Sequence, residues 1–270
     1  MELFVKKRVV TASQMLPELA VWEAGSSSGL PLVLVHGSCT TSDYFADAVP
    51  DLACSACVVV YDRRGYGESG TCNDYSVTAQ AGDLLRVVDV AGGRAAIVAH
   101  SAGSVMAMEF AARHPEEVAT LILFEPILPF AIECPPEFVS TFELVRQNAE
   151  RGKYNLAARL FLTLMGPADA GAAQVGKASE GDFWASCEHF IRDELDGLFA
   201  YEPDFKALKH VDLSVVVSDM PHGDQYPGSA RALINRAGAR LAMARGYHNF
   251  PRERPHEFAE LVKSLVAGRS

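Results

Sequence analysis

The sequence has no apolar run long enough to cross a lipid bilayer, and it is poor in positive charge. Its 24 lysines and arginines are outnumbered by 34 aspartates and glutamates, so the formal net charge is −10 at pH 7. The densest basic cluster is Lys6, Lys7 and Arg8, in a segment that we expect to form a strand. Nucleic acids and anionic membranes bind basic surfaces. We therefore expect neither as a partner.

The amino-terminal residues lack the apolar stretch of a signal peptide, because Lys6, Lys7 and Arg8 stand in its place. We therefore expect a cytoplasmic protein. Six cysteines are too few for a disulfide framework in a chain of 270 residues. Cys54 and Cys57 form a C-x-x-C pair, but no second metal-binding pair follows them. We expect buried free thiols and no metal.

No internal repeat or low-complexity segment is present, and the 49% hydrophobic and 21% charged residues are ordinary for a globular protein. Helical apolar spacing at residues 76–91 ends at Gly92 and Gly93. Similar helical segments alternate with short apolar runs typical of strands buried on both faces, at residues 31–35, 57–61, 95–98, 118–124 and 213–217. This alternation predicts an α/β fold, with a mostly parallel sheet of about eight strands and helices on both faces.

The alternation of strands and helices stops between about residues 127 and 210. This stretch is helical in character and rich in aromatic residues, and strands resume after it. We interpret it as an inserted helical cap. The predicted organisation is a core formed by residues 1–126 and 211–270, interrupted by a cap at residues 127–210.

A corner of small residues joins the apolar run at residues 95–98 to the helical segment at residues 105–112. Ala99 and Gly103 stand two positions before and two positions after Ser101. A strand that turns directly into a helix leaves room for one tight bend, whose central residue is strained and presents its side chain. Ser101 would then lie at a helix N-terminus, where backbone N–H groups favour a developing negative charge.

Three motifs together resemble those of the α/β-hydrolase fold family, in the branch with a serine nucleophile. They are the corner at Ser101, the pair His36-Gly37 and the loop Asp62-x-Arg64-Gly65-x-Gly67-x-Ser69. The corner departs from the usual pattern by having Ala99 in place of glycine. The resemblance covers about residues 30–125 and 213–266, whereas the cap matches only by position and aromatic content. A serine at the corner excludes relatives with an aspartate there, such as haloalkane dehalogenases.

A serine nucleophile needs a base within hydrogen-bond reach, and His248 lies where the family has its catalytic histidine. A carboxylate must in turn orient the imidazole, and three candidates are open. We favour Glu125, at the end of the strand that follows the corner helix, as in the family's zearalenone-type lactonases. Pro126 favours an extended Glu125 that projects from the sheet edge. Asp219 and Asp224 follow the next strand of the core, where most of the family has an aspartate.

The resemblance also implies an oxyanion hole formed by the backbone N–H groups of Ser38 and Ala102. Gly37, His100 and Trp184 are the candidate substrate contacts. For His100, which is next to Ser101 and would point elsewhere, a structural role is favoured, and for Trp184 a plain core role is equally open. The aromatic cap would form a mostly apolar pocket that suits a medium-sized hydrophobic substrate.

The predicted function is a cofactor-free serine hydrolase that cleaves an ester or a lactone through an acyl-enzyme. The same residues would also serve a C–C bond or thioester hydrolase, or a cyclase or lyase in biosynthesis. A third possibility is a non-catalytic ligand-binding module, as in the hormone receptors of this family. The fold cannot separate these functions, because function depends on the site. The expected partner is a small hydrophobic molecule, and a homodimer is left open.

Overall fold

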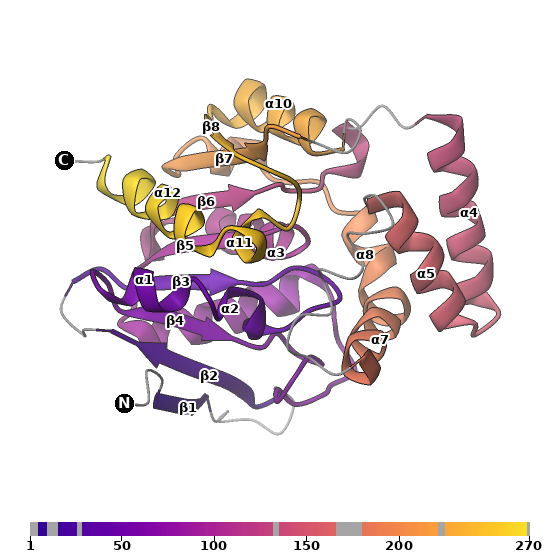
Figure 1. Ribbon diagram of the computed structural model, residues 1–270, viewed down its shortest axis with the longest axis horizontal. Helices are drawn as coiled ribbons and strands as arrows, with labels where there is room; N and C mark the ends of the chain where they lie inside the picture. The colour runs from indigo at the N-terminus through magenta and orange to yellow at the C-terminus, as the bar shows by residue number, and fades with distance from the viewer. Residues whose placement is uncertain are drawn as a thin grey trace.

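One eight-stranded sheet forms the centre of the computed structural model, which describes residues 5–9, 16–25, 29–131, 135–165, 180–220 and 225–268. Its strands are β1 (Val5–Val9), β2 (Leu19–Ala24), β3 (Leu32–Val35), β4 (Val58–Tyr61), β5 (Ala95–His100), β6 (Val118–Phe124), β7 (Leu213–Ser218) and β8 (Arg240–Ala244). Their order is β1-β2-β4-β3-β5-β6-β7-β8 (Figure 1). The pairs β1-β2 and β2-β4 are antiparallel, and every pairing from β4 to β8 is parallel. The predicted α/β class and mostly parallel sheet are confirmed.

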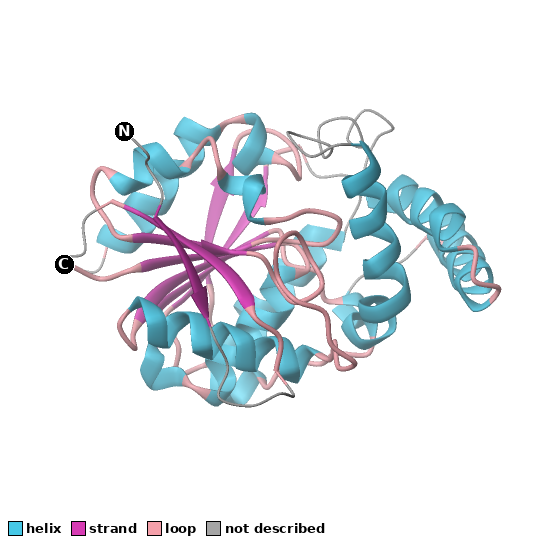
Figure 2. Cartoon of the chain, turned by 90° about the horizontal axis from the view of Figure 1, so that it is seen from below, coloured by secondary structure: helices cyan, strands magenta, loops and turns pink. Residues whose placement is uncertain are grey.

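Helices cover both faces of this sheet (Figure 2). One layer consists of α2 (Val77–Ala91), α3 (Gly103–Arg113) and α10 (Gln225–Ala237), and the other of α1 (Val49–Ala53) and α12 (Pro255–Ala267). Along β3, Val33 and Val35 pack with the first layer, whereas Leu32 and Leu34 pack with the second. Successive side chains of a strand point to opposite faces, so a continuous apolar run needs a layer on each side.

Only helical elements and loops occur in the described chain between β6 and β7. They include α4 (Pro136–Glu150), α5 (Tyr154–Met165), α7 (Glu180–His189), a π-helical turn at Phe190–Glu194, α8 (Leu195–Phe199) and α9 (Phe205–Leu208). We call these elements the helical insertion. Its helices α4, α5, α7 and α8 lie together on one side of the sheet (Figure 1). None of the described helices is long and apolar enough to span a membrane.

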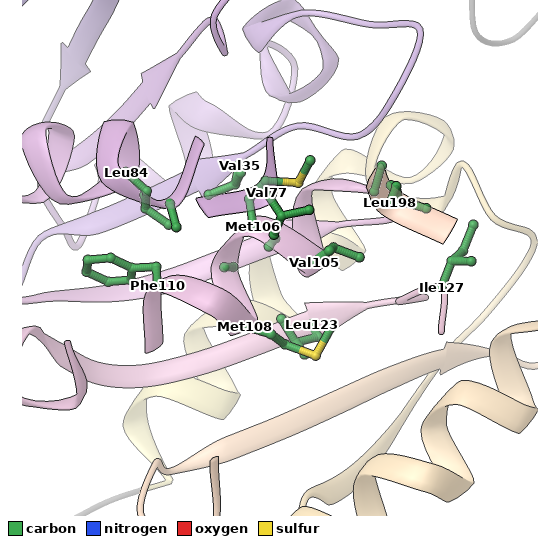
Figure 3. Close-up of a cluster of buried hydrophobic side chains, with 14 of the residues drawn as sticks. Val35, Val77, Leu84, Val105, Met106, Met108, Phe110, Leu123, Ile127 and Leu198 are labelled. Carbon is green, nitrogen blue, oxygen red and sulfur yellow. The ribbon is translucent and has the colours of Figure 1, made fainter. Parts of the chain in front are cut away.

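The larger core cluster joins the helical insertion to the sheet. Figure 3 shows Val105 and Met106 of α3 in this cluster, with Val35 of β3 nearby. Leu198 of α8 belongs to the same cluster, as does Phe161 of α5. The apolar face of the insertion is therefore buried against the core that holds α3.

The cysteine pair Cys54 and Cys57 differs in part from the expectation. Neither residue forms a disulfide, but Cys54 is exposed and Cys57 is only partly buried. Cys54 follows the short helix α1 and donates a hydrogen bond to the Pro50 carbonyl at 3.3 Å. The helix end therefore turns this side chain toward solvent.

The first turn of α3 lies directly against the end of β3. A Cβ atom at Gly103 would lie 2.4 Å from the carbonyl oxygen of His36 and 2.9 Å from that of Val35. Both oxygens belong to the backbone, so neither can rotate away. Glycine at this position is what allows β5 to pass into α3 through a single tight bend.

The Gly103→Ala variant should therefore lower the free energy of unfolding by about 2 kcal/mol or more, through overpacking. Gly82→Ala is the matched control, because Gly82 lies inside α2 and no atom lies within 4 Å of its Cβ position. This second substitution should stabilise the protein by about 0.5–1 kcal/mol. Urea unfolding measures both effects, and a Gly103→Ala variant as stable as the wild type would contradict the close approach.

Candidate active site

Ser101 occupies the bend between β5 and α3 with a strained backbone. Its φ of 52° lies in the left-handed region, which costs a residue other than glycine about 1–3 kcal/mol. The strain is held in place from both sides, because the Ser101 N–H donates to the Phe124 carbonyl at 2.9 Å and the Ser104 N–H donates to the Ser101 carbonyl at 2.9 Å. This is the conformation that the small-residue corner predicts for the presented serine.

The loop after β3 lies against this serine. A Cβ atom at Gly37 would lie 3.1 Å from the Cβ atom of Ser101, so glycine permits the contact. Within the described parts of the chain, no protein acceptor takes the backbone N–H of Ser38 or of Ala102. These two N–H groups, one on the loop and one before α3, are therefore available to an acceptor other than the protein.

His36 holds the loop in one arrangement. Its Nδ1–H donates to the Gly37 carbonyl at 2.9 Å, and its Nε2 accepts from the Arg63 backbone N–H at 3.0 Å. The two contacts together require a single neutral tautomer. Burial of the ring, with a smaller effect of the Arg63 charge, holds the pKa of His36 well below its usual value.

His248 and Glu125 meet at the carboxyl ends of the strands. The Nδ1–H of His248 donates to Glu125 Oε2 at 2.8 Å. The other carboxylate oxygen, Oε1, accepts from the Ser218 backbone N–H at 2.9 Å and from the Ser218 hydroxyl. Glu125 is 3% exposed, so both of its oxygens are paired in a buried setting. The remaining ring nitrogen of His248, Nε2, is left with a lone pair.

The backbone of Glu125 differs from the sequence prediction. Pro126 favours an extended residue before it, but Glu125 has φ 45°, in the left-handed region. The chain leaves β6 at this point while the Glu125 N–H still donates to the Val216 carbonyl of β7 at 2.9 Å. The bend and the two Ser218 hydrogen bonds, not an extended chain, direct the carboxylate toward His248.

The two alternative carboxylates have different outcomes. Asp219 is exposed, and its Oδ1 accepts the Gly246 backbone N–H at 2.8 Å. This bond ties the end of β7 to the loop that carries His248, so Asp219 supports the loop and does not contact the ring. Asp224 lies outside the described residues.

Two further rings contact His248. Tyr226 of α10 stacks on the imidazole with ring centroids 4.4 Å apart and an interplanar angle of 7°. The ring of His100 lies 4.5 Å away, and its Nε2–H donates to the His248 carbonyl at 2.9 Å. Burial, with a smaller effect of His248, keeps the pKa of His100 well below its usual value. His100 therefore holds the His248 backbone as a neutral ring.

One pocket brings the candidates together. Ser101 and His248 both line it, although 147 positions separate them in the sequence. Phe161 and Leu162 of α5 contribute apolar wall, and the other lining residues are Ser38, Cys39, Thr40, Tyr44, His100 and Asn249. Within the described ranges, no three His, Cys, Asp or Glu side chains gather as metal ligands.

Trp184 and Gly37 do not line this pocket. The Trp184 indole packs against Phe183, at a centroid distance of 5.1 Å, and under the Arg159 guanidinium, 3.9 Å from the ring centroid. The structure thus places Trp184 between α7 and α5 and not at the serine. Gly37 contributes through its closeness to Ser101, and only His100 of the three candidate substrate contacts reaches the pocket wall.

The family profile described as alpha/beta hydrolase fold matches residues 31–169, just over half of the chain. The chain belongs to the α/β-hydrolase fold family. The matched range contains the loop after β3, the bend at Ser101 and the end of β6 that carries Glu125.

Individual relatives within this family are distant. The chain is 28% identical over 202 residues to the uncharacterized hydrolase YraK of Bacillus subtilis, a match that covers 73% of this chain and 71% of YraK. A thermophilic esterase from Thermogutta terrifontis superposes with a TM-score of 0.75 at 22% identity over 98% of both chains. The enol-lactonase from Burkholderia xenovorans LB400 gives a TM-score of 0.69 at 22% identity, over 93% of this chain and 96% of that chain. At such identities, the two structures establish a shared fold.

Sequence reasoning missed several residues that support this family site. Ser218 is the last residue of β7 and lies beside Glu125, which follows the neighbouring strand β6. Its place at a strand end was the only signal in the sequence. Tyr226 is the second residue of α10, and no motif in the sequence pointed to it. Arg63 occupies the unspecified position of the motif Asp62-x-Arg64, so the motif gave no reason to select it.

Two buried neutral histidines predict that the protein loses stability in acid. His36 and His100 bind protons with a pKa near the ordinary 6.5 when unfolded but well below it when folded. The unfolded chain thus binds more protons, and the free energy of unfolding should fall as the pH drops below about 6.5, by up to about 1.4 kcal/mol per pH unit for each histidine.

Urea unfolding at about pH 7 and about pH 5.5 measures this decrease. His36→Asn is the informative variant, because an amide can still donate to the Gly37 carbonyl but does not titrate. Its stability should depend less on pH than that of the wild type. The same pH dependence in both proteins would show that His36 does not contribute.

Proposed function

We propose that the protein is a serine hydrolase that cleaves esters or lactones through an acyl-enzyme. Ser101 is the nucleophile, His248 the general base and Glu125 the carboxylate that orients it. The observation that carries the proposal is the hydrogen bond from His248 Nδ1 to Glu125 at 2.8 Å, at a pocket that His248 shares with the strained Ser101.

The hydrogen bond to Glu125 determines what His248 can do. Because Nδ1 carries the proton donated to Glu125, Nε2 is free to take the proton of the Ser101 hydroxyl as its oxygen attacks a carbonyl carbon. Glu125 stabilises the imidazolium that forms. His248 then returns the proton to the leaving alkoxide, and the acyl group stays on Ser101. Water, deprotonated by the same nitrogen, releases the acid and restores the serine.

The negative charge of the tetrahedral intermediate needs donors beside Ser101. The N–H groups of Ser38 and Ala102 have no protein acceptor in the described chain, and both residues adjoin the serine. Two backbone donors of this kind form the oxyanion hole of the proposed enzyme. The positive end of α3 adds to the same effect.

The substrate that suits this pocket is medium-sized and largely hydrophobic. Phe161 and Leu162 supply apolar wall from the helical insertion, which we propose as the cap over the site. A thermophilic esterase and an enol-lactonase share the fold, in line with this substrate class.

Ser101→Ala should lower kcat for a p-nitrophenyl ester by about 10³-fold or more, because the variant has no oxygen to form the acyl-enzyme. The thermal unfolding midpoint should remain close to that of the wild type. Steady-state kinetics and calorimetry measure the two quantities. Turnover that survives in Ser101→Ala would contradict a serine nucleophile, and a wild type without any turnover would favour a ligand-binding module.

Glu125→Gln should lower kcat by about 10³- to 10⁴-fold, because an amide neither fixes the tautomer of His248 nor stabilises its charge. Asp219→Asn is the matched control, a neutral substitution of the other carboxylate near the His248 loop. It should lower kcat by less than about tenfold, since it affects only the loop. The reverse order of these two effects would assign the acid to Asp219.

A further inference from the structure

The Arg63 side chain connects the loop beside Ser101 to the helical insertion. It is 1% exposed, and its Nη2–H donates to the Gly37 carbonyl at 3.0 Å. Its Nη1–H donates to Gln80 at 2.5 Å and to the two carboxylate oxygens of Glu194 at 3.0 and 3.1 Å. Glu194 ends the π-helical turn of the insertion, 131 positions later in the chain. One guanidinium thus bonds to both parts of the fold.

The carbonyl that Arg63 holds belongs to the peptide group whose other end is the Ser38 N–H. A trans peptide is planar, and its C=O and N–H point in opposite directions. Fixing the Gly37 oxygen on the side of Arg63 therefore directs the Ser38 N–H to the opposite side. Ser38 itself lines the pocket that contains Ser101.

The charge on Arg63 adds an electrostatic effect to this orientation. A cationic donor on a carbonyl oxygen polarises the amide and makes its N–H a stronger donor, and the effect is larger in a buried setting. The Gly37 carbonyl also accepts a hydrogen bond from the His36 ring, so two donors fix the direction of this carbonyl. Burial alone would lower the pKa of Arg63, but the Glu194 carboxylate reverses this and the guanidinium stays charged.

Glu194 is the counter-ion that the buried Arg63 charge requires. Its side chain is fully buried, and it also accepts the Tyr66 hydroxyl at 3.0 Å. The Arg63 charge keeps the pKa of Glu194 below its usual value despite the burial. A buried charge without its partner is strongly destabilising. Arg63 can therefore hold its position beside Gly37 only while the insertion is seated on the core.

We propose that Arg63 is a positioning residue for the oxyanion hole, and that its ion pair with Glu194 makes the Ser38 N–H depend on the seating of the helical insertion. This rests on the proposed serine hydrolase function. The residue acts through the Gly37–Ser38 peptide and does not touch the substrate. The insertion thereby affects transition-state stabilisation as well as the shape of the pocket.

The neighbouring Arg64 provides an internal contrast. It is 2% exposed and pairs with Asp83 at 2.6 Å, and it donates to the carbonyls of Asp74 and Ala79. None of these contacts reaches the loop after β3. Arg63 and Arg64 are thus two buried arginines of one motif, and only Arg63 bonds to the peptide beside Ser101.

The test compares Arg63→Lys with Arg64→Lys. Each keeps the positive charge but loses the planar fork that bonds to several acceptors at once. Kinetics with p-nitrophenyl acetate give kcat and KM, and competition with phenylboronic acid, which forms a tetrahedral adduct with a serine, reports the oxyanion hole. Arg63→Lys should lower kcat and weaken boronate binding by about 10- to 100-fold with KM within about threefold, since removing a whole donor costs about 10²–10³. Arg64→Lys should change neither quantity by more than about threefold.

The double variant Arg63→Met/Glu194→Gln is included in case a single variant fails to fold. It removes both buried charges together and so leaves neither without its partner. It should show the same selective loss of kcat and of boronate affinity. When Arg63 is present, the Glu194→Gln substitution should lower kcat. When Arg63 is already replaced by methionine, the same substitution should change kcat little further. Independent effects of the two positions would overturn the coupling to the insertion.

The outcomes separate this inference from the proposed function. If the wild-type protein neither hydrolyses p-nitrophenyl acetate nor binds phenylboronic acid, the proposed function itself is contradicted. A wild type that does both, with Arg63→Lys equal to it in kcat and boronate affinity, would overturn only the role of Arg63. Equal losses in Arg63→Lys and Arg64→Lys would show a general loosening of the motif and would also overturn it.

Discussion

The hydrogen bond between Glu125 and His248 is the interaction on which the account of this site depends. It joins the end of β6 to the loop after β8, and it fixes which nitrogen of His248 carries the proton. Each partner is restrained by its surroundings. Ser218 pairs with the second oxygen of Glu125, and the rings of Tyr226 and His100 contact the imidazole. The site is therefore organised before any substrate arrives, and preorganised groups are the main source of electrostatic catalysis.

The tight passage from β5 into α3 is the constraint that places Ser101 at the wall of the pocket that His248 also lines. Gly103 permits α3 to touch the end of β3, and Gly37 permits the loop after β3 to touch Ser101. Ser101 has a positive φ at one of these close approaches, and Glu125 has a positive φ where the chain leaves β6. Two strained residues other than glycine at the ends of adjacent strands are typical of a functional site.

Much of this arrangement could be predicted from the sequence, because it depends on local patterns. The apolar runs give the strands of a parallel sheet, and the small residues around Ser101 give the bend. Glu125 was favoured over Asp219 mainly because the family's zearalenone-type lactonases have a glutamate at the same strand end, and the structure brings Glu125 to His248. The contacts of Ser218, Tyr226 and Arg63 were not predictable, because each depends on residues that are distant in the sequence and on side-chain directions that no local pattern encodes. The extended geometry expected for Glu125 was wrong for the same reason, since hydrogen bonds from β7 outweigh the local effect of Pro126.

The most direct test of the central claim is the site and rate of covalent labelling by a serine-directed fluorophosphonate, followed by peptide mass spectrometry. The account predicts a single phosphonyl group on Ser101 in the wild type, and labelling slowed by about 10²-fold or more in His248→Asn, because the general base is lost. Phosphonylation at another serine, or a rate at Ser101 that does not depend on His248, would contradict it.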